Sequence, residues 1–112
     1  MKTVAIFGKE LNHKYKEDII FLLDYLKEKG IEIQIHKKYL KKLKDEFQMD
    51  LSHAIPFSLA RNKNHRPDLF ISIGGDGTFL DSTVMLRDTR IPILGINTGR
   101  LGFLARVSSE DI

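Results

Sequence analysis

Hydrophobic and polar residues alternate along the chain with two different periods, and the switches between them predict strand, helix and strand in turn. A β-branched, apolar run predicts a first strand over Lys2–Phe7. Apolar residues three and four positions apart then predict an amphipathic helix over Lys14–Lys29, with Gly30 as its C-terminal cap. Isoleucines at every second position predict a second strand over Ile31–Ile35 with one solvent-exposed face. This order is typical of a parallel α/β sheet.

The second half of the chain continues this pattern around two apolar strands. A lysine-rich segment with apolar residues on one side predicts a surface helix over Lys37–Phe47, whose basic face is either simply solvated or guides an anionic ligand. Residues 48–66 predict no regular element, because Pro56 interrupts any long helix. Short β-rich runs predict buried strands over Asp68–Ile73 and Ile91–Ile96. We therefore expect one α/β domain with a mostly parallel sheet.

A glycine-rich turn, Gly74–Leu80, follows the first of these two strands and reads Gly-Gly-Asp-Gly-Thr-Phe-Leu. Glycine lets a ligand approach the backbone closely, and the N–H groups at the start of a following helix favour an anion. Asp76 lies in the middle of the turn, where its charge would repel that anion, so we expect it to have a catalytic role. In isolation, the same residues would also suit an ordinary tight turn.

A helix is predicted after this turn over Thr78–Leu86, with Leu80, Val84 and Met85 at helical spacing. A second glycine-bearing loop, Asn97–Leu104, follows the last predicted strand. Because the ligands of open α/β sheets bind at the carboxyl ends of the strands, we expect the two loops to form the walls of one pocket.

Several other candidate positions have more ordinary interpretations. Gly8, directly after the first predicted strand, marks either a nucleotide-facing loop or a plain turn. Asp76 and Asp81 are close in sequence but should face different directions, so a pair of cooperating carboxylates is not expected. The histidines show no metal-ligand spacing and are interpreted as surface or capping residues: His13, His36, His53 and His65.

Composition limits the possible partners more than it identifies one. The 112 residues suit a single domain, and 42% hydrophobic with 29% charged residues is ordinary globular composition. There is no cysteine, and no apolar run approaches the roughly 20 residues of a membrane span. The net charge of +3 suits anionic small molecules and is too weak to indicate nucleic acid. We therefore expect a cytoplasmic protein that binds neither nucleic acid nor membrane.

The two glycine-bearing loops together resemble the motifs of NAD kinases. The Gly-Gly-Asp-Gly-Thr segment Gly74–Thr78 resembles a signature shared with lipid kinases and, more loosely, phosphofructokinases. The segment Gly95–Leu104, which reads Gly-Ile-Asn-Thr-Gly-Arg-Leu-Gly-Phe-Leu, specifically resembles the second NAD kinase motif. The resemblance covers the whole chain but only the amino-terminal portion of such a kinase, and it implies a Rossmann-like, phosphofructokinase-like fold.

The resemblance also implies a reaction and its participants. ATP or polyphosphate would donate a phosphoryl group to the 2′-hydroxyl of the adenosine ribose of NAD, giving NADP, with Mg²⁺ or another divalent metal. Asp76 would accept or orient the hydroxyl proton, while Asn97 and Gly99 would shape their loop. Because a carboxylate is a weak base at neutral pH, we favour orientation with late proton transfer. The positions implied to bind NAD or ATP are Gly74, Gly75, Asp76, Gly77, Thr78, Asn97 and Phe103; no metal ligand is assigned.

Two departures from the resemblance remain. Many NAD kinases carry a basic residue shortly after the first motif, where this chain has Asp81. A β-rich second domain, which would complete the NAD site and form a homo-oligomer, is also expected after the α/β domain of residues 1–107, with its connection beginning at 108–112. Residues 1–112 alone should then have little activity. The alternatives are a lipid or sugar kinase of the same superfamily and a non-catalytic nucleotide-sensing module.

Overall fold

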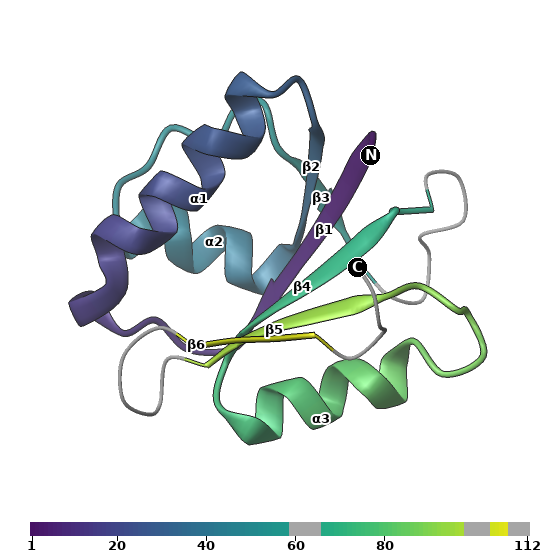
Figure 1. The fold of residues 1–112 in the computed structure, drawn as a ribbon. Helices are drawn as coiled ribbons and strands as arrows, with labels where there is room; N and C mark the ends of the chain where they lie inside the picture. Colours follow the sequence, from purple (N-terminus) through teal and green to yellow (C-terminus); the bar gives the residue numbers. More distant parts are fainter. Residues whose placement is uncertain (59–65, 98–103, 108–112) are drawn as a thin grey trace.

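The chain forms a single sheet with its helices on both faces (Figure 1). The computed structural model describes residues 1–58 and 66–97, together with the backbone of 104–107. Within these residues, the strand order is β3-β2-β1-β4-β5-β6; the first five strands are parallel, and β6 is antiparallel to β5. The strands are β1 Thr3–Gly8, β2 Glu32–His36, β3 Ile55–Phe57, β4 Leu69–Gly74, β5 Ile93–Asn97 and β6 Leu104–Val107. The expected α/β fold with a mostly parallel sheet is confirmed.

Within the described residues, helices lie on both faces of the sheet (Figure 1). Helix α1, Lys16–Glu28, follows a short 3₁₀ turn, His13–Tyr15, and ends before Gly30, whose φ of 73° is the left-handed conformation expected of a C-terminal cap. Helix α2, Lys37–Glu46, lies on the same side, and α3, Asp76–Met85, packs on the opposite side. None of the helices in the described residues is long and apolar enough to span a membrane.

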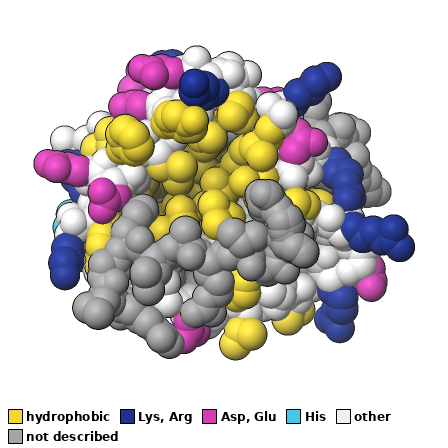
Figure 2. Space-filling view, in the orientation of Figure 1, with side chains coloured by type: hydrophobic (Ala, Val, Ile, Leu, Met, Phe, Trp, Pro, Cys, Tyr) yellow, Lys and Arg dark blue, Asp and Glu magenta, His cyan; other side chains and the backbone are white. Residues whose placement is uncertain are grey.

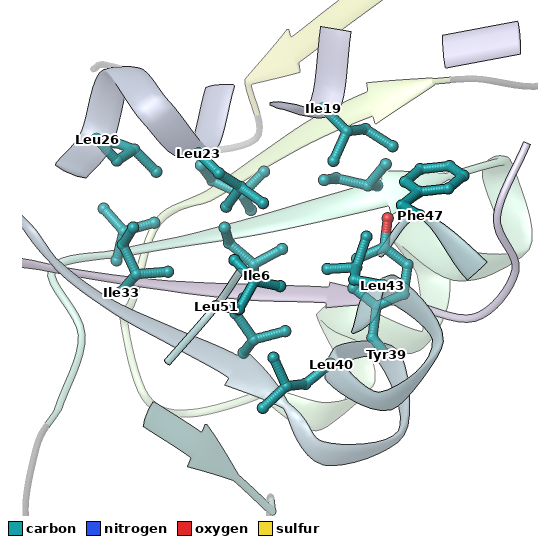
Figure 3. Packing of buried hydrophobic residues seen from close by; sticks show 14 of the residues in the cluster. Ile6, Ile19, Leu23, Leu26, Ile33, Tyr39, Leu40, Leu43, Phe47 and Leu51 are labelled. Carbon is teal, nitrogen blue, oxygen red and sulfur yellow. The ribbon is translucent and has the colours of Figure 1, made fainter. Parts of the chain in front are cut away.

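The larger hydrophobic core lies between the sheet and the layer formed by α1 and α2 (Figure 3). Strand residues that alternate along the sheet, such as Val4 and Ile6, point into this core, whereas Ala5 and Phe7 point to the other face. The helices contribute the residues that their apolar periodicity predicts, so both predicted helices are confirmed. Their buried members are Ile19, Leu23 and Leu26 of α1 and Tyr39, Leu40 and Leu43 of α2.

This layer does not cover the sheet evenly. Figure 2 shows hydrophobic side chains gathered at the centre of the face, between the positions of α1 and α3 in Figure 1, with charged side chains around them. Leu69 of β4 and Leu94 of β5 pack against the larger core but remain partly exposed. The α1–α2 layer therefore protects the β1–β2 half of the sheet more completely than the β4–β5 half.

Helix α3 is confirmed, but its predicted apolar side is wrong. Leu80 and Val84 are 61% and 59% exposed, and the buried residues of the helix are Thr78 and Ser82. These small side chains let the helix lie close to the sheet. The buried Ser82 hydroxyl donates a hydrogen bond to the Thr78 carbonyl oxygen at 3.0 Å, so its donor is paired within the helix. Phe79 is partly buried against the smaller hydrophobic core, which lies on the α3 side of the sheet and includes Ala5 and Phe7. Close packing by small residues gives no hydrophobic periodicity, which is why the pattern pointed to the wrong face.

Three further differences from the prediction concern strands. Strand β3 lies in the segment where no element was expected, and it contains Pro56, which is tolerated because β3 is an edge strand of the sheet. Strand β6 begins at Leu104, which had been placed in a loop. The second face of β2 was expected to be wet, yet Gln34 is only 1% exposed. The reason is that β2 is an interior strand, paired on both sides, and Gln34 is aligned with the buried Ala5 of β1.

Gly8 is a packing glycine at the end of β1. A Cβ atom built at this position would lie only 2.7 Å from Cζ of Tyr39, which is buried on α2. Real Cβ atoms essentially never approach other atoms this closely. The absence of a side chain at Gly8 therefore lets the first turn of α2 pack against β1, and neither of the two sequence interpretations included this contact.

Candidate active site

The predicted site forms where β4 and β5 end side by side. Gly74 and Asn97 are the last residues of these strands and are aligned in the parallel register. The chain then turns from Gly74 into α3, at the lower left of Figure 1. The glycine turn and the start of the second loop thus meet at the carboxyl edge of the sheet, where open α/β sheets bind ligands.

Gly74 makes the sharp turn from strand to helix possible. Its φ of 153° is a conformation that residues with a side chain rarely adopt, and a Cβ there would lie 2.7 Å from Oγ1 of Thr78. Gly75 and Gly77 differ from it, because a Cβ at either position would meet no heavy atom within 4 Å. The space beside these two glycines is therefore open for a ligand to approach the backbone.

Helix α3 begins inside the motif rather than after it. Asp76 is its first residue, Gly75 is its N-cap, and Asp76 and Gly77 are exposed. The first N–H groups of an α-helix have no acceptor within the helix, and together with the helix dipole they favour a negatively charged ligand. The expected anion-binding geometry is therefore present at the glycine turn.

Asp76 is oriented by the neighbouring strand. Nδ2 of Asn97 donates a hydrogen bond to Oδ1 of Asp76 at 3.2 Å. Asn97 is buried at the end of β5, so its amide is held in place, whereas Asp76 is exposed. One carboxylate oxygen of Asp76 is thereby fixed by a rigid element of the fold. Asn97 is expected from the sequence to shape its loop and to bind the nucleotide, but its contact with Asp76 is not.

A groove of about 530 Å³ lies beside the glycine turn. One wall consists of Gly74, Gly75, Gly77 and Thr78 of the turn, and the other is the segment Lys9–His13 between β1 and α1. Lys9 forms an ion pair with Asp81 of α3, and Nζ of Lys42 on α2 donates to the Lys9 carbonyl. Lys9–His13 has no predicted role, although the position of this segment after a parallel strand is a signal that it reaches this edge.

The described part of the chain brings six of the predicted site residues together: Gly74, Gly75, Asp76, Gly77, Thr78 and Asn97. Asp76 and Asp81 have different partners, as expected for carboxylates that do not form a pair. Phe103 and Gly99 lie outside the described residues, as does the segment 108–112. In residues 1–58 and 66–97, no three side chains of His, Asp or Glu cluster as metal ligands would.

Comparisons with known proteins agree on one family. The family model described as the ATP-NAD kinase N-terminal domain matches residues 4–112. Two similar relatives are the NAD kinase of Christiangramia forsetii, 39% identical over 97% of this chain, and that of Bacteroides fragilis, 40% identical over 96% of this chain. The alignments cover 37% and 36% of those relatives, so the chain spans somewhat more than a third of their length.

A solved structure has the same fold. The crystal structure of yeast NADH kinase complexed with NADH superposes with a TM-score of 0.69 over 93% of this chain and 33% of that chain, at 21% identity. This identity is too low to show more than the fold, but the family model covers nearly every residue of the chain. On the strength of that match, with the glycine turn, Asp76 and Asn97 in place, the chain belongs to the family of ATP-NAD kinase N-terminal domains.

Proposed function

We propose that this chain provides the phosphate-binding turn and the catalytic aspartate of a NAD kinase. The proposed reaction transfers a phosphoryl group from ATP or polyphosphate to the 2′-hydroxyl of the adenosine ribose of NAD, and the product is NADP. The observation that carries the proposal is the hydrogen bond between Asn97 and Asp76, which orients a carboxylate at the start of α3, beside open glycines. The relatives named NAD kinase support the same reaction.

In this mechanism, Asp76 positions the attacking hydroxyl. The ribose oxygen forms a bond to the terminal phosphorus of the donor, and the bond from that phosphorus to the bridging oxygen breaks, so that ADP or a polyphosphate shortened by one unit leaves. The hydroxyl proton passes to Asp76 late in the reaction. Phosphoryl transfer depends mainly on positioning and on stabilising the charge of the phosphoryl group. The backbone N–H groups of Gly77 and Thr78 stabilise that charge from the start of α3. Asn97 keeps the carboxylate of Asp76 directed at the hydroxyl.

A divalent metal, with Mg²⁺ as the first candidate, fits this donor set when the nucleotide shares in binding it. Mg²⁺ is usually bound by one or two carboxylates together with substrate phosphates, not by a cage made only of protein. Asp76 is one such carboxylate, exposed beside the phosphate-binding turn. The metal would neutralise charge on the phosphates.

The rest of the proposal concerns the complete enzyme. The residues that complete the NAD site, among them Phe103 of this chain, are proposed to surround the glycine turn from the second loop and from a β-rich second domain reached through 108–112. We also propose that this second domain forms a homo-oligomer and that the enzyme acts in the cytoplasm. The match to only 37% of a relative's length supports a second domain. The proposed acceptor is NAD, in line with the names of the relatives.

The test is to replace Asp76 by asparagine and by alanine in the full-length protein and to measure NADP formation from NAD, ATP and Mg²⁺. We expect kcat to fall by about 10²- to 10⁴-fold, the range of general acid–base contributions, while NAD binding measured by calorimetry changes little. Asp18→Asn, an exposed aspartate on α1, is the matched control. Near-normal turnover of Asp76→Asn would contradict the mechanism. If the wild type has no kinase activity and Asp76→Ala weakens NAD binding, the result would favour a nucleotide-sensing module.

A further inference from the structure

Lys9 carries a positive charge at the groove beside the glycine turn, and Asp81 holds it there. Lys9 follows the end of β1 and lines the groove, whereas Asp81 lies in the second turn of α3. The two side chains form an ion pair and are 52% and 43% exposed. Lys9 is therefore fixed in direction by α3 while its ammonium group stays accessible to a ligand.

The backbone of Lys9 is held from a third element. Nζ of Lys42 on α2 donates to the carbonyl oxygen of Lys9, so the segment after β1 is tied to both α2 and α3. This contact also brings the ammonium group of Lys42 next to Lys9. The position of Lys9 is thus determined by long-range contacts and not by its loop alone.

The charges that line the groove are mixed, with Lys9 and Glu10 of opposite sign, but the lysine ammonium group and the backbone N–H groups at the start of α3 both suit a phosphate oxygen. The charged or titratable lining residues of the groove are Lys9, Glu10 and His13, and its other wall is the amino-terminal end of α3. The positive end of the helix dipole and the ammonium group of Lys9 therefore border the same volume of about 530 Å³. A linear anion lying in the groove would contact the glycine turn and Lys9 together.

We propose that Lys9 binds the phosphate chain of a nucleotide substrate and that Asp81 is its positioning residue. This inference rests on the proposed kinase function and extends it to a residue outside the glycine turn. A lysine ammonium has three donors, so Lys9 binds Asp81 and a phosphate oxygen at the same time. Exposed ion pairs contribute little to stability, so Lys9 shifts toward the phosphate at small cost. The carboxylate of Asp81 is compatible with an anion site because Lys9 neutralises it.

The pyrophosphate of NAD and the triphosphate of ATP share this chemistry, and kinetics distinguish them. In the full-length protein, Lys9→Met should raise the KM of one of the two nucleotides by about 10- to 100-fold, as expected for one lost charge-assisted hydrogen bond, with kcat within about twofold. The nucleotide whose KM rises is the one that Lys9 binds. Lys9→Arg should recover most of the affinity, and Asp81→Asn should raise the same KM by only about 2- to 5-fold.

A charge swap separates this role from a purely structural one. Lys9→Asp combined with Asp81→Lys keeps an ion pair but places a carboxylate on the groove wall, so its KM should be at least as high as that of Lys9→Met. If the swap restores the wild-type KM, the pair only ties the loop to α3 and the proposal is wrong. Lys41→Met is the matched control, because Lys41 pairs with Asp45 at 2.9 Å on α2 and does not line the groove.

A failure of the proposed kinase function can be distinguished from a failure of the proposed role of Lys9. If the wild-type protein forms no NADP, calorimetric titration with ATP and with NAD still measures the contribution of Lys9 to binding. An unchanged KM or dissociation constant for both nucleotides in Lys9→Met, with an unfolding midpoint like that of the wild type, overturns the role of Lys9. Binding of neither nucleotide by the wild type overturns both proposals.

Discussion

Replacing Gly8 by alanine inserts a methyl group into the contact between the end of β1 and α2. The new Cβ would lie 2.7 Å from Cζ and 2.8 Å from Cδ1 of Tyr39, with Cε1 nearer still, whereas ordinary contact begins at 3.4 Å. The ring would have to move by more than 0.7 Å (3.4 − 2.7). It is buried among residues of the larger core, so the neighbours must move as well. Overpacking of this kind costs about 1–3 kcal/mol, out of a total of about 5–15 kcal/mol for a typical domain.

The assay is equilibrium unfolding in urea, followed by circular dichroism. We expect Gly8→Ala to lower the midpoint at an unchanged m value, because the native state is strained and the surface exposed on unfolding stays the same. Gly77→Ala is the control, since a Cβ at this helical position meets no atom within 4 Å. It should be neutral or stabilising by up to about 1 kcal/mol.

A double variant tests the assigned cause. If the ring of Tyr39 is the obstacle, adding Gly8→Ala to Tyr39→Leu should cost less than about 0.5 kcal/mol, because the two substitutions are coupled. The reasoning would be refuted if Gly8→Ala left the midpoint unchanged or cost the same in both backgrounds. A wild-type midpoint combined with weaker nucleotide binding would instead support the interpretation of Gly8 as part of a nucleotide-facing loop.

Two further predictions concern polar groups outside the site. Burial raises the pKa of the Tyr39 hydroxyl, which has no hydrogen-bond partner among the residues that the structure describes. Tyr39→Phe should therefore stabilise the protein by about 1 kcal/mol in the same urea assay, and destabilisation would show that the hydroxyl is hydrogen-bonded. The Asp68 carboxylate accepts the N–H groups of Lys2 and Thr3 at 2.7 and 2.9 Å, and these bonds lower its pKa in the folded state. Its stabilisation is therefore present above the unfolded pKa of about 3.9 and lost as the pH falls through the folded value. Asp68→Asn should destabilise at pH 7 and much less at pH 2, whereas an equal loss at both values would exclude this linkage.

The sequence predicted the elements whose hydrophobic pattern reflects a single packing partner. Helices α1 and α2 each place one apolar side on the sheet, so their periodicity located both helices and most of their buried residues, Tyr39 of α2 being the exception. Strand β3 was missed because it is short and contains Pro56, which sequence reasoning associates with a break. The burial of Gln34 was missed because it depends on β2 having neighbours on both sides, and local alternation contains no information about this.

The site was predictable to the extent that it depends on strand ends. Because β4 and β5 are parallel neighbours, the residues that end them meet, so the strand order expected from the sequence is enough to place Asp76 and Asn97 at one edge. The hydrogen bond between them depends on side-chain geometry and could not be predicted in the same way. The pair of Lys9 and Asp81 joins the segment after β1 to helix α3 through a contact that has no sequence motif, so only the structure reveals it.

The close approach of α3 to the sheet has an evolutionary consequence. A Cβ at Gly95 would lie 2.8 Å from Cε1 of Phe79, and Thr78 and Ser82 are buried on the same helix. A larger side chain at Gly95 should therefore persist in evolution only together with a smaller side chain at Phe79. An alignment of homologues would show this compensation as covariation of the two positions. Leu80 and Val84 face outward and are free of this constraint. Selection on Asp76 thus acts indirectly on residues that never contact a substrate, because these residues determine the distance between the sheet and the helix that carries Asp76.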